Sequence, residues 1–404
     1  MASREIRVDA LVIGAGPAGS AAAIELAKGG AHVALVDRHD FPRDKVCGDA
    51  LIPDALRALE HLRLRNCVLT KARVLNRIRV YAPDERFVVI PGECACVPRG
   101  ILDEIIRGEA VKQGAQFYAG FGLDTAIRSD DGVEGARFLG QGGQALTVRA
   151  PVTLLATGAA AEPLKRFNVC ERVSPGATAA RIYVKADEAF SRHFDHLCIS
   201  YDQTICPGYG WIFPGPAGVF NVGVGYYYDA RTTPREKNIR ILLNRFLNAF
   251  PPAIELMQRS QPISSLKGAP LRTALEGATL AVPGLLVIGE AAGLTYSFSG
   301  EGIGKAMESG IIAADVIRTS DTGRQRAAEI AREYSARIRE SFTARFRAYK
   351  IAQDWLSRPA IANLLAWRAN RSRFVQRQLE GMFQETVDPR QLFSMAGVLR
   401  SLIS

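Results

Sequence analysis

The sequence predicts an α/β protein in which a Rossmann-like unit with a parallel sheet is interleaved with a mainly antiparallel β unit and followed by a helical C-terminal region. A glycine-rich turn between a predicted strand and a predicted helix lies near the N-terminus, and a second turn of this kind lies near residue 290. Between them, short runs rich in aromatic residues alternate with proline-containing turns, which is typical of antiparallel strands. With 404 residues the chain is long enough for two or three domains.

The first segment shows the order strand, turn, helix, strand. Residues 6–13 form an apolar, β-branched run, and Pro17–Lys28 is rich in alanine with no helix breaker after Gly19. Gly29-Gly30 is expected to end this helix, and residues 32–36 form the second strand. This order indicates a βαβ unit at the start of the chain.

We expect three regions along the chain. Residues 1–174 and 283–318 form one discontinuous cofactor-binding domain, which includes a helix over Arg99–Lys112 with apolar residues at helical spacing. Residues 175–282 form a second, mainly β-sheet domain that binds the substrate, and residues 319–404 form a helical C-terminal region. The chain thus leaves the first domain and returns to it, a layout that fits a large cofactor.

The composition, with 48% hydrophobic and 23% charged residues, is that of a soluble globular protein. No apolar run approaches the roughly 18 residues that a membrane-spanning helix needs, and Gly14 begins to interrupt the N-terminal run that resembles a signal peptide. We therefore expect a cytoplasmic protein whose seven cysteines are reduced. Cys94 and Cys96 have no histidine cluster nearby, so no metal site is predicted.

The segment Gly14-Ala15-Gly16-Pro17-Ala18-Gly19 has the spacing of a dinucleotide-binding turn. Gly14 permits the tight turn, Gly16 lets a pyrophosphate approach the backbone, and Gly19 lets the helix pack closely on the strand. The N-terminus of the following helix then faces the phosphates. Asp37 ends the second strand 23 residues after Gly14, where a carboxylate can bind ribose hydroxyls. A purely structural glycine turn is the alternative, and Asp37 favours the dinucleotide.

Four further segments favour FAD over NAD. Arg99 begins a helix and can reach a pyrophosphate, the alternative being a surface salt bridge with Asp103. A strand that ends in Thr157-Gly158 suits close approach of a cofactor, and Glu290 follows another strand where a carboxylate can bind a ribityl hydroxyl. The segment 300–304 then begins a helix whose positive end can stabilise charge at the N1/C2 carbonyl of a reduced flavin. Two separated strand-to-helix turns are expected for an extended dinucleotide such as FAD.

Taken together, these segments resemble the geranylgeranyl reductase family of FAD-dependent enzymes, in the para-hydroxybenzoate hydroxylase-like superfamily. The specific elements are Lys45-Val46-Cys47-Gly48-Asp49, which follows Asp37-Arg38, and Gly208-Tyr209-Gly210-Trp211-Ile212-Phe213-Pro214. The resemblance spans about residues 6–318, and the C-terminal helices match more loosely. It implies reduction of isolated double bonds in the polyprenyl chains of lipids, quinones or the chlorophyll phytyl tail.

The resemblance assigns candidate catalytic roles to Cys47, Tyr209, Trp211 and Phe213. On a strand the three aromatic side chains share one face, where they form either a wall for an apolar chain or a core aromatic ladder. Cys47 is either a thiol that lies over the flavin and orients the substrate or relays a proton, or an inert buried residue. The residues expected to bind the cofactor are Gly14, Gly16, Pro17, Ala18, Gly19, Asp37, Arg38, Cys47, Gly48, Asp49, Arg99, Thr157, Gly158, Glu290, Gly300, Gly302 and Ile303.

The chain departs from the family pattern at three places. Glu290 stands where the family usually has Asp, and the loop of residues 295–299 lacks the proline that often precedes Gly-Glu-Gly. Ala159-Ala160-Ala161 replaces an Asp-Gly pair implicated in flavin and NAD(P)H contact. The expected electron donor is accordingly either NAD(P)H or a reduced ferredoxin or flavin partner. No segment indicates which prenyl length the enzyme takes.

Basic residues are concentrated in residues 318–377, which hold 14 Arg and Lys and five acidic residues, a net +9 of the chain's +10. One interpretation is a solvated helical face. The other is peripheral contact with the anionic inner face of the membrane, because Phe342, Phe346, Trp355 and Trp367 interleave with the basic residues. Nucleic acid is not an expected partner, since no recognition motif accompanies the charge.

The expected partner is thus a polyprenyl lipid or another hydrophobic small molecule, and two other functions remain open. A flavin-dependent monooxygenase, halogenase or dehydrogenase acting on an aromatic or polyketide substrate shares the fold. A halogenase would show Trp-x-Trp-x-Ile-Pro, whereas this chain has Gly210-Trp211-Ile212-Phe213-Pro214. A non-catalytic flavin-binding protein would leave Cys47, the aromatic strand and both glycine loops without a role.

Overall fold

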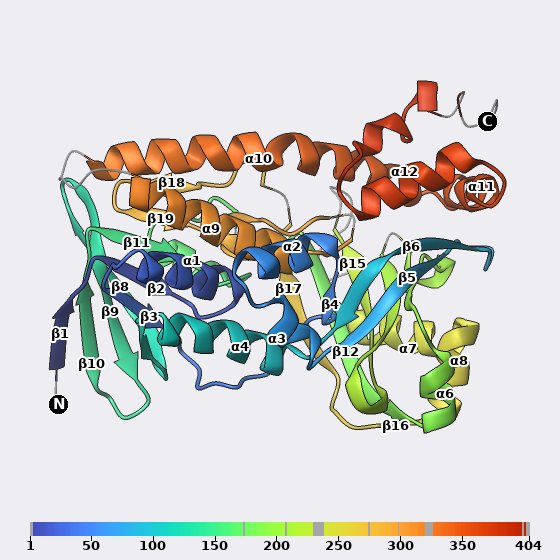
Figure 1. The fold of residues 1–404 in the computed structure, drawn as a ribbon, viewed down its shortest axis with the longest axis horizontal. Helices are drawn as coiled ribbons and strands as arrows, with labels where there is room; N and C mark the ends of the chain where they lie inside the picture. The colour runs from blue at the N-terminus through green and yellow to red at the C-terminus, as the bar shows by residue number, and fades with distance from the viewer. Residues whose placement is uncertain are drawn as a thin grey trace.

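The computed structural model describes residues 3–172, 174–206, 208–228, 238–273, 275–297, 299–319, 326–397 and 400. Two sheet-containing halves lie side by side along the long axis of the molecule, and the long helix α10 (Arg326–Leu356) runs along them towards the C-terminal helices (Figure 1). The predicted fold class is confirmed: a Rossmann-like unit, a mainly antiparallel β unit and C-terminal helices are all present.

The first half is built on a six-stranded sheet with the order β18-β19-β11-β2-β3-β7. All neighbouring strands are parallel except β18 and β19. The central strands are apolar and fully buried, as expected for a parallel sheet covered on both faces. The bounds are β2 Ala10–Ile13, β3 Val33–Val36, β7 Gln116–Tyr118, β11 Val152–Leu155, β18 Ala281–Val282 and β19 Leu285–Val287.

Helices and a smaller sheet cover this parallel sheet. The helix α1 packs against α4 and α9 and contacts β2 and β3. A four-stranded sheet with the order β1-β10-β9-β8 contacts the parallel sheet through β9 and β11. The predicted bounds of α1 and α4 are confirmed. The elements are α1 Pro17–Lys28, α4 Arg99–Lys112, α9 Ile303–Thr319, β1 Ser3–Arg7, β8 Phe121–Ser129, β9 Gly132–Gly140 and β10 Ala145–Arg149.

The prediction of one strand over residues 6–13 is wrong, because the run is divided between two sheets. Its first part belongs to β1, which pairs with β10, and its second part is β2, which pairs with β11 and β3. Asp9 lies at the break, and its carboxylate accepts a hydrogen bond of 2.7 Å from the backbone N–H of His32. This bond ties the break to the start of β3, at the point where the chain changes sheet.

The second half is a nine-stranded sheet with the order β16-β12-β15-β14-β13-β5-β6-β4, in which β17 also pairs with β12. One face packs on helices α7 (Ile239–Ala249) and α8 (Pro251–Gln258), and the other face turns towards the first half. The strands are β4 Ala50–Leu51, β5 Arg73–Tyr81, β6 Phe87–Cys96, β12 Ala177–Ala186, β13 Leu197–Ser200, β14 Tyr209–Pro214, β15 Val219–Tyr227, β16 Ser260–Pro262 and β17 Lys267–Leu271.

The large sheet contains strands from both sides of residue 174, where the first expected region ends. Its strands β4, β5 and β6 come from residues 50–96, and β5 pairs in parallel with β13. The chain therefore enters the large sheet, returns to the parallel sheet and enters the large sheet again. Alternating polarity predicts that such segments are strands, but it does not say which distant strand each one joins.

Further helices complete the fold. In the first 200 residues these are α2 Pro53–His61, α3 Arg65–Leu69, α5 Ala161–Arg166 and α6 Glu188–His193, and the C-terminal ones are α11 Pro359–Ala369 and α12 Arg373–Phe383. Both α11 and α12 contact β6, so the C-terminal region lies over the edge of the large sheet. None of the helices in the described part of the chain combines the length and apolar character that a membrane crossing requires. Asp321 and Arg324 of the predicted basic stretch lie outside the described residues.

Candidate active site

Three glycine-containing loops meet at the carboxyl edge of the parallel sheet. Register places the ends of β2, β11 and β19 next to one another, with Ile13 beside Leu155 and Leu155 beside Val287. Gly14 follows β2 with a φ of +105°, and a Cβ atom there would lie 2.4 Å from the carbonyl oxygen of Ala156. The loop that starts at Gly14 therefore touches the loop that follows β11, and only glycine fits at position 14.

Asp37 holds the first glycine loop in place. One carboxylate oxygen accepts a hydrogen bond of 2.8 Å from the backbone N–H of Ala15, and the other accepts one of 2.9 Å from His39. Arg38 bonds only to the ring of the neighbouring His39 in the described structure. The location of Asp37 at the end of β3 agrees with the predicted ribose-binding position, and its binding role stays a prediction.

Arg99 lies in a buried ion pair rather than in the surface salt bridge that was the alternative. It is 4% exposed and donates two hydrogen bonds of 2.7 Å to Asp103, while Arg43 lies 3.2 Å from the same carboxylate. Burial opposes the charge of Arg99, but Asp103 outweighs burial and raises the pKa of the guanidinium. Arg43 Nη2 also lies 3.6 Å from where a Cβ of Gly16 would be. Two guanidinium groups for one carboxylate leave positive charge beside the loop where a pyrophosphate would bind.

The ends of β11 and β19 carry polar atoms without partners. Glu290 Oε2 accepts a hydrogen bond of 3.1 Å from Lys45, whereas Glu290 Oε1 is buried and has no partner among the described residues. Thr157 Oγ1 is buried and equally unpartnered there. Buried polar atoms are normally satisfied, so these two fit the hydroxyl groups of an extended sugar or ribityl chain. The residues at this edge therefore fit FAD.

The predicted loop Cys47-Gly48-Asp49 is fastened to the large sheet through Asn221 of β15. The Asn221 amide donates to the carbonyl of Cys47 at 2.7 Å and to Asp49 at 2.8 Å, and it accepts from Trp211 Nε1 at 2.9 Å. Tyr183 also donates to Asp49. Burial raises the pKa of the Asp49 carboxyl to about 6 although these hydrogen bonds oppose it. Cys47 is partly buried, and the backbone N–H of Asp49 lies 3.4 Å from its sulfur.

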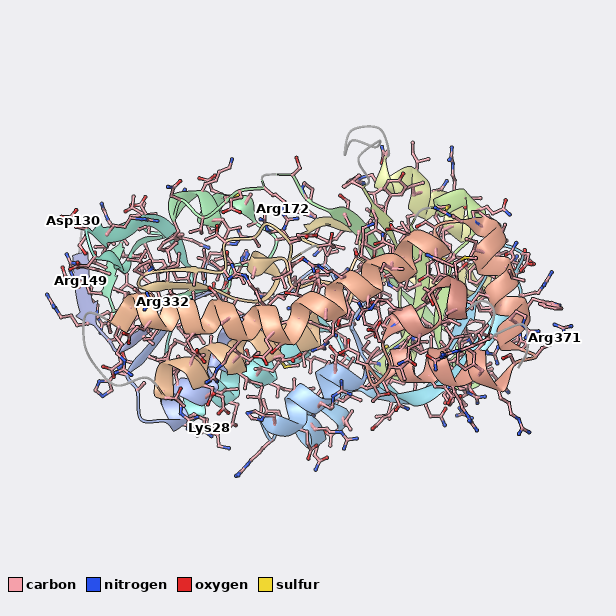
Figure 2. The ribbon with its side chains drawn as sticks, turned by 90° about the horizontal axis from the view of Figure 1, so that it is seen from above. Lys28, Asp130, Arg149, Arg172, Arg332 and Arg371 are labelled. Carbon is pink, nitrogen blue, oxygen red and sulfur yellow. The ribbon has the colours of Figure 1, made fainter. Side chains whose placement is uncertain are left out.

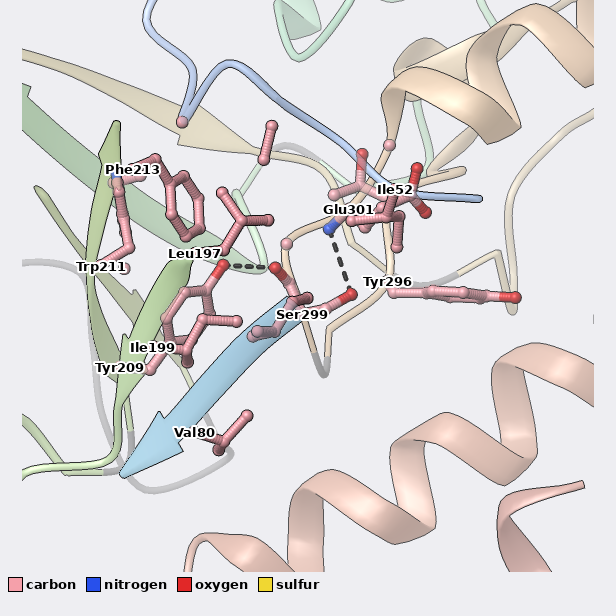
Figure 3. A pocket seen from close by; sticks show the side chains of 18 of the residues that line it. Ile52, Val80, Leu197, Ile199, Tyr209, Trp211, Phe213, Tyr296, Ser299 and Glu301 are labelled. Atoms are coloured by element: carbon pink, nitrogen blue, oxygen red, sulfur yellow. Dashed lines mark hydrogen bonds between the residues drawn. The ribbon is translucent and has the colours of Figure 1, made fainter. Parts of the chain in front are cut away.

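The three aromatic side chains of β14 share one face, as predicted. Ring centroids of Tyr209 and Trp211 are 6.0 Å apart, and those of Trp211 and Phe213 are 6.2 Å apart. The Tyr209 hydroxyl donates to the carbonyl of Ser299, as Figure 3 shows. Gly300 follows with a φ of +65°, and a Cβ there would lie 2.7 Å from the Tyr209 hydroxyl. This contact joins the aromatic strand to the second glycine turn.

A continuous cavity connects these groups to the C-terminal helices. Its polar end contains Cys47, Asp49, Arg99, Glu290 and the turn of residues 299–303. From there it passes the aromatic face of β14 (Figure 3) and continues between the large sheet and helices α11 and α12. The far end is lined by aliphatic side chains: Ile78, Val80, Val88, Ile90, Ala362, Leu365, Ala366 and Leu379.

Several polar residues that support the site from a distance were not predicted from the sequence. Asn221 and Tyr183 lie in β15 and β12, and Asp54 and Lys305 form a buried pair at 2.6 Å under the second glycine turn. Lys305 falls on the apolar stripe of a predicted helix, a position that a lysine normally avoids. That signal was available in the sequence, whereas nothing in the sequence marks Asn221.

Comparison with known proteins agrees with the geometry of the site. Residues 7–196 match the model of the family described as FAD binding domain. The chain is 32% identical over 321 residues to a menaquinone reductase of Mycolicibacterium smegmatis, covering 77% of this chain and 76% of that one. It is 28% identical to a digeranylgeranylglycerophospholipid reductase of Methanosarcina acetivorans, covering 80% and 79%. A geranylgeranyl bacteriochlorophyll reductase-like structure from Thermoplasma acidophilum superposes with a TM-score of 0.79 at 21% identity, covering 99% and 97%.

Fold and site together define an enzyme that is an FAD-dependent oxidoreductase. More narrowly, the chain belongs to the geranylgeranyl reductase family, as the sequence motifs predicted.

We expect Gly14→Ala to abolish FAD binding. A side chain at φ +105° costs about 2 kcal/mol, and the clash with Ala156 would also push the first two loops apart. The measurement is the flavin absorbance of the purified protein together with its melting temperature. Gly108→Ala is the matched control, because a Cβ there meets nothing within 4 Å inside α4 and Ala stabilises a helix relative to Gly. Full FAD occupancy in the Gly14 variant would contradict the assignment of this loop.

Proposed function

We propose that this enzyme reduces isolated C=C bonds of a polyprenyl chain carried by a lipid or a quinone. The observation that supports this most strongly is the shape and polarity of the cavity. It starts at the polar loops that fit FAD and ends between aliphatic side chains of β5, β6, α11 and α12. A chain of isoprene units has no polar group to pair, so it matches an apolar channel of this kind.

The names of the relatives point the same way. One is a menaquinone reductase and another is a digeranylgeranylglycerophospholipid reductase, and both names contain a molecule with a prenyl chain. Their shared element is the chain, because a quinone and a glycerophospholipid have unrelated head groups. The apolar end of the cavity is the part of this protein that suits such a chain.

Bound and reduced, FAD supplies the hydride for such a reaction. We propose that Tyr209, Trp211 and Phe213 press the alkene against the cofactor side of the cavity and exclude water from it. Cys47 lines the same region at the end of the Lys45–Asp49 loop and completes its wall. Gly14, Gly16, Arg99, Thr157 and Glu290 hold the cofactor.

The electron donor is proposed to be NAD(P)H or a reduced ferredoxin or flavin partner. Ala159 to Ala161 follow Gly158 at the cofactor edge and offer no side-chain donor or charge to a nicotinamide nucleotide. This composition favours a protein donor or a free reduced flavin over direct reduction by NAD(P)H.

We further propose that the apolar end of the cavity faces an anionic membrane surface. The basic residues of α10 are spread along the molecule, and several are paired, such as Arg337 with Asp315 and Lys350 with Asp354. Figure 2 shows Arg332 and Arg371 far apart along the molecule, with Arg371 at the end where α11 and α12 lie. Five arginines near these helices form no salt bridge with any described residue: Arg358, Arg368, Arg371, Arg373 and Arg377.

The chain-length dependence of Ala366→Trp tests the course of the prenyl tail. Ala366 is 4% exposed and lines the far part of the cavity, so a Trp there would block a long tail but leave the aromatic wall untouched. We expect kcat/KM for a four-isoprene substrate to fall at least about 10-fold, because each buried CH2 contributes about 0.8 kcal/mol. A two-isoprene substrate is expected to react at the wild-type rate.

Leu364→Trp is the matched control on the same helix, since Leu364 is 50% exposed and is not among the lining residues. The melting temperature and FAD content of both variants are also measured. Wild-type values in Ala366→Trp would show that its lower rate comes from a blocked cavity and not from misfolding. Equal rates for both chain lengths in Ala366→Trp would place the tail elsewhere.

The double variant R368Q/R371Q tests membrane contact. Each arginine near an anionic surface contributes about 1 kcal/mol, so losing two should weaken binding to phosphatidylserine vesicles about 30-fold at low salt. Co-sedimentation measures this binding. R332Q/R339Q removes the same charge from exposed positions of α10 and should bind like the wild type. Equal weakening of vesicle binding by R368Q/R371Q and R332Q/R339Q would show non-specific electrostatic attraction. A wild-type protein that does not bind the vesicles would exclude the proposed membrane contact.

A further inference from the structure

A buried ion cluster lies at the N-terminus of α9, below the second glycine turn. Lys305 Nζ is 2.6 Å from Asp54 Oδ2 and 2.6 Å from Glu301 Oε2, and it also contacts Glu385. The exposed fraction of the lysine side chain is 0%, and those of the three acids are below a tenth. The cluster therefore joins α2, α9 and the segment after α12 away from water.

The charges of this cluster do not balance if every acid is ionised. Three carboxyl groups face Lys305 and Arg345, which pairs with Glu385. Among the described residues, Arg57 is 56% exposed and 3.9 Å from Glu385, and Arg345 also lies 3.2 Å from a fourth carboxyl group, that of Glu308. The rings of Tyr296 and Tyr349 are further neighbours. An unpaired buried carboxylate costs several kcal/mol, so one acid is expected to keep its proton.

The hydrogen-bond pattern locates this proton between Asp54 and Glu301. Asp54 Oδ1 and Glu301 Oε2 are buried and have no hydrogen-bond partner among the described residues, although Lys305 lies near the latter. Carboxylate oxygens of the three acids lie within 4.8 Å of one another. Asp54 and Glu385 both accept a hydrogen bond from Lys305, and Glu385 also accepts one from Arg345, so these two acids are kept ionised. Burial raises the pKa of Glu301, and Lys305 lowers that of Asp54 against the effect of burial.

Glu301 also lies in the wall of the cavity. It follows Ser299 and Gly300, on the side opposite the aromatic strand, as Figure 3 shows. Its backbone N–H lies 3.3 Å from Ser299 Oγ. Tyr209, the other acid at this point, already donates its proton to the carbonyl of Ser299, and burial raises its pKa. Glu301 Oε1 accepts a hydrogen bond of 3.1 Å from the backbone N–H of Gly304, so the proton of this acid lies on Oε2, where no backbone carbonyl of the described residues accepts it.

We propose that Glu301 is a catalytic residue that protonates one carbon of the substrate C=C bond. This inference rests on the proposed function. The π electrons form the new C–H bond with the Glu301 proton, and the other carbon accepts the hydride that reduced FAD provides. The Glu301 carboxylate left behind is stabilised by Lys305 at 2.6 Å, and a proton returns to it from solvent through the cavity, whose wall includes Glu301. The sum is the addition of two hydrogens to the alkene.

The decisive variant is Glu301→Gln, which keeps the size of the side chain and removes the acid. In single turnovers of chemically reduced holoenzyme with a geranylgeranyl lipid under argon, we expect a loss of at least about 100-fold, the lower range for general acid catalysis. FAD content should be unchanged. Asp315→Asn is the matched control, because Asp315 is a surface carboxylate on α9, the helix that follows Glu301, and is paired with Arg337. It should react at the wild-type rate.

A second readout needs no turnover. The infrared spectrum of the oxidised holoenzyme at pH 8 should show the carbonyl band of a protonated carboxylic acid, at a pH where Asp49, with a pKa of about 6, is ionised. The band should be absent in Glu301→Gln. If Glu301→Gln does not bind FAD, the Asp54→Asn variant is measured instead. A shifted carbonyl band and slower reduction of the lipid are then expected, because the Glu301 proton loses the Asp54 carboxylate that it faces.

Three results would overturn the assignment. A Glu301→Gln enzyme that reduces the lipid at the wild-type rate would exclude Glu301 as the acid. A wild type without the band, or a band that persists in Glu301→Gln and is unshifted in Asp54→Asn, would place the proton elsewhere. A wild type that shows the band but reduces no prenyl chain would overturn the catalytic role together with the proposed function, and the wild type alone reveals this case.

Discussion

The buried charge of Lys305 is the interaction on which the arrangement of the site depends. Its ammonium group binds carboxyl groups from α2, from the turn before α9 and from the segment after α12. Removing one partner of a buried ion pair typically costs about 3–5 kcal/mol, so these three segments are held together strongly. The C-terminal helices are thereby fixed over the second glycine turn, and they close the cavity at its apolar side.

The chemistry follows from where the cavity changes polarity. At the carboxyl edge of the parallel sheet, backbone loops, Arg99 and unpartnered oxygens suit a charged, hydroxyl-rich cofactor. Beyond the aromatic face of β14 the lining is aliphatic, and a five-carbon isoprene unit buried there would gain about 4 kcal/mol. The reacting bond of a bound chain would lie where the two environments meet, between Tyr209 and Glu301.

Local sequence signals predicted the parts of the site that depend on backbone conformation. The glycine turn at Gly14, the helix bounds of α1 and α4 and the common face of Tyr209, Trp211 and Phe213 follow from short-range rules of sterics and periodicity. The break at Asp9, the transfer of β5 and β6 to the large sheet and the partners of Lys305 depend on segments far apart in the chain. No single-sequence pattern specifies such pairings, although a lysine on an apolar helix stripe marks where one is needed.

The most direct test of the proposed function is the mass of the product formed from a polyprenyl lipid by chemically reduced holoenzyme, with and without oxygen. The proposed function predicts a gain of two hydrogens for each double bond reduced, located in the prenyl chain, with the head group unchanged and no dependence on oxygen. An oxygen-dependent gain of one oxygen atom, a halogen incorporated when halide is present, or reduction confined to a quinone ring would contradict it.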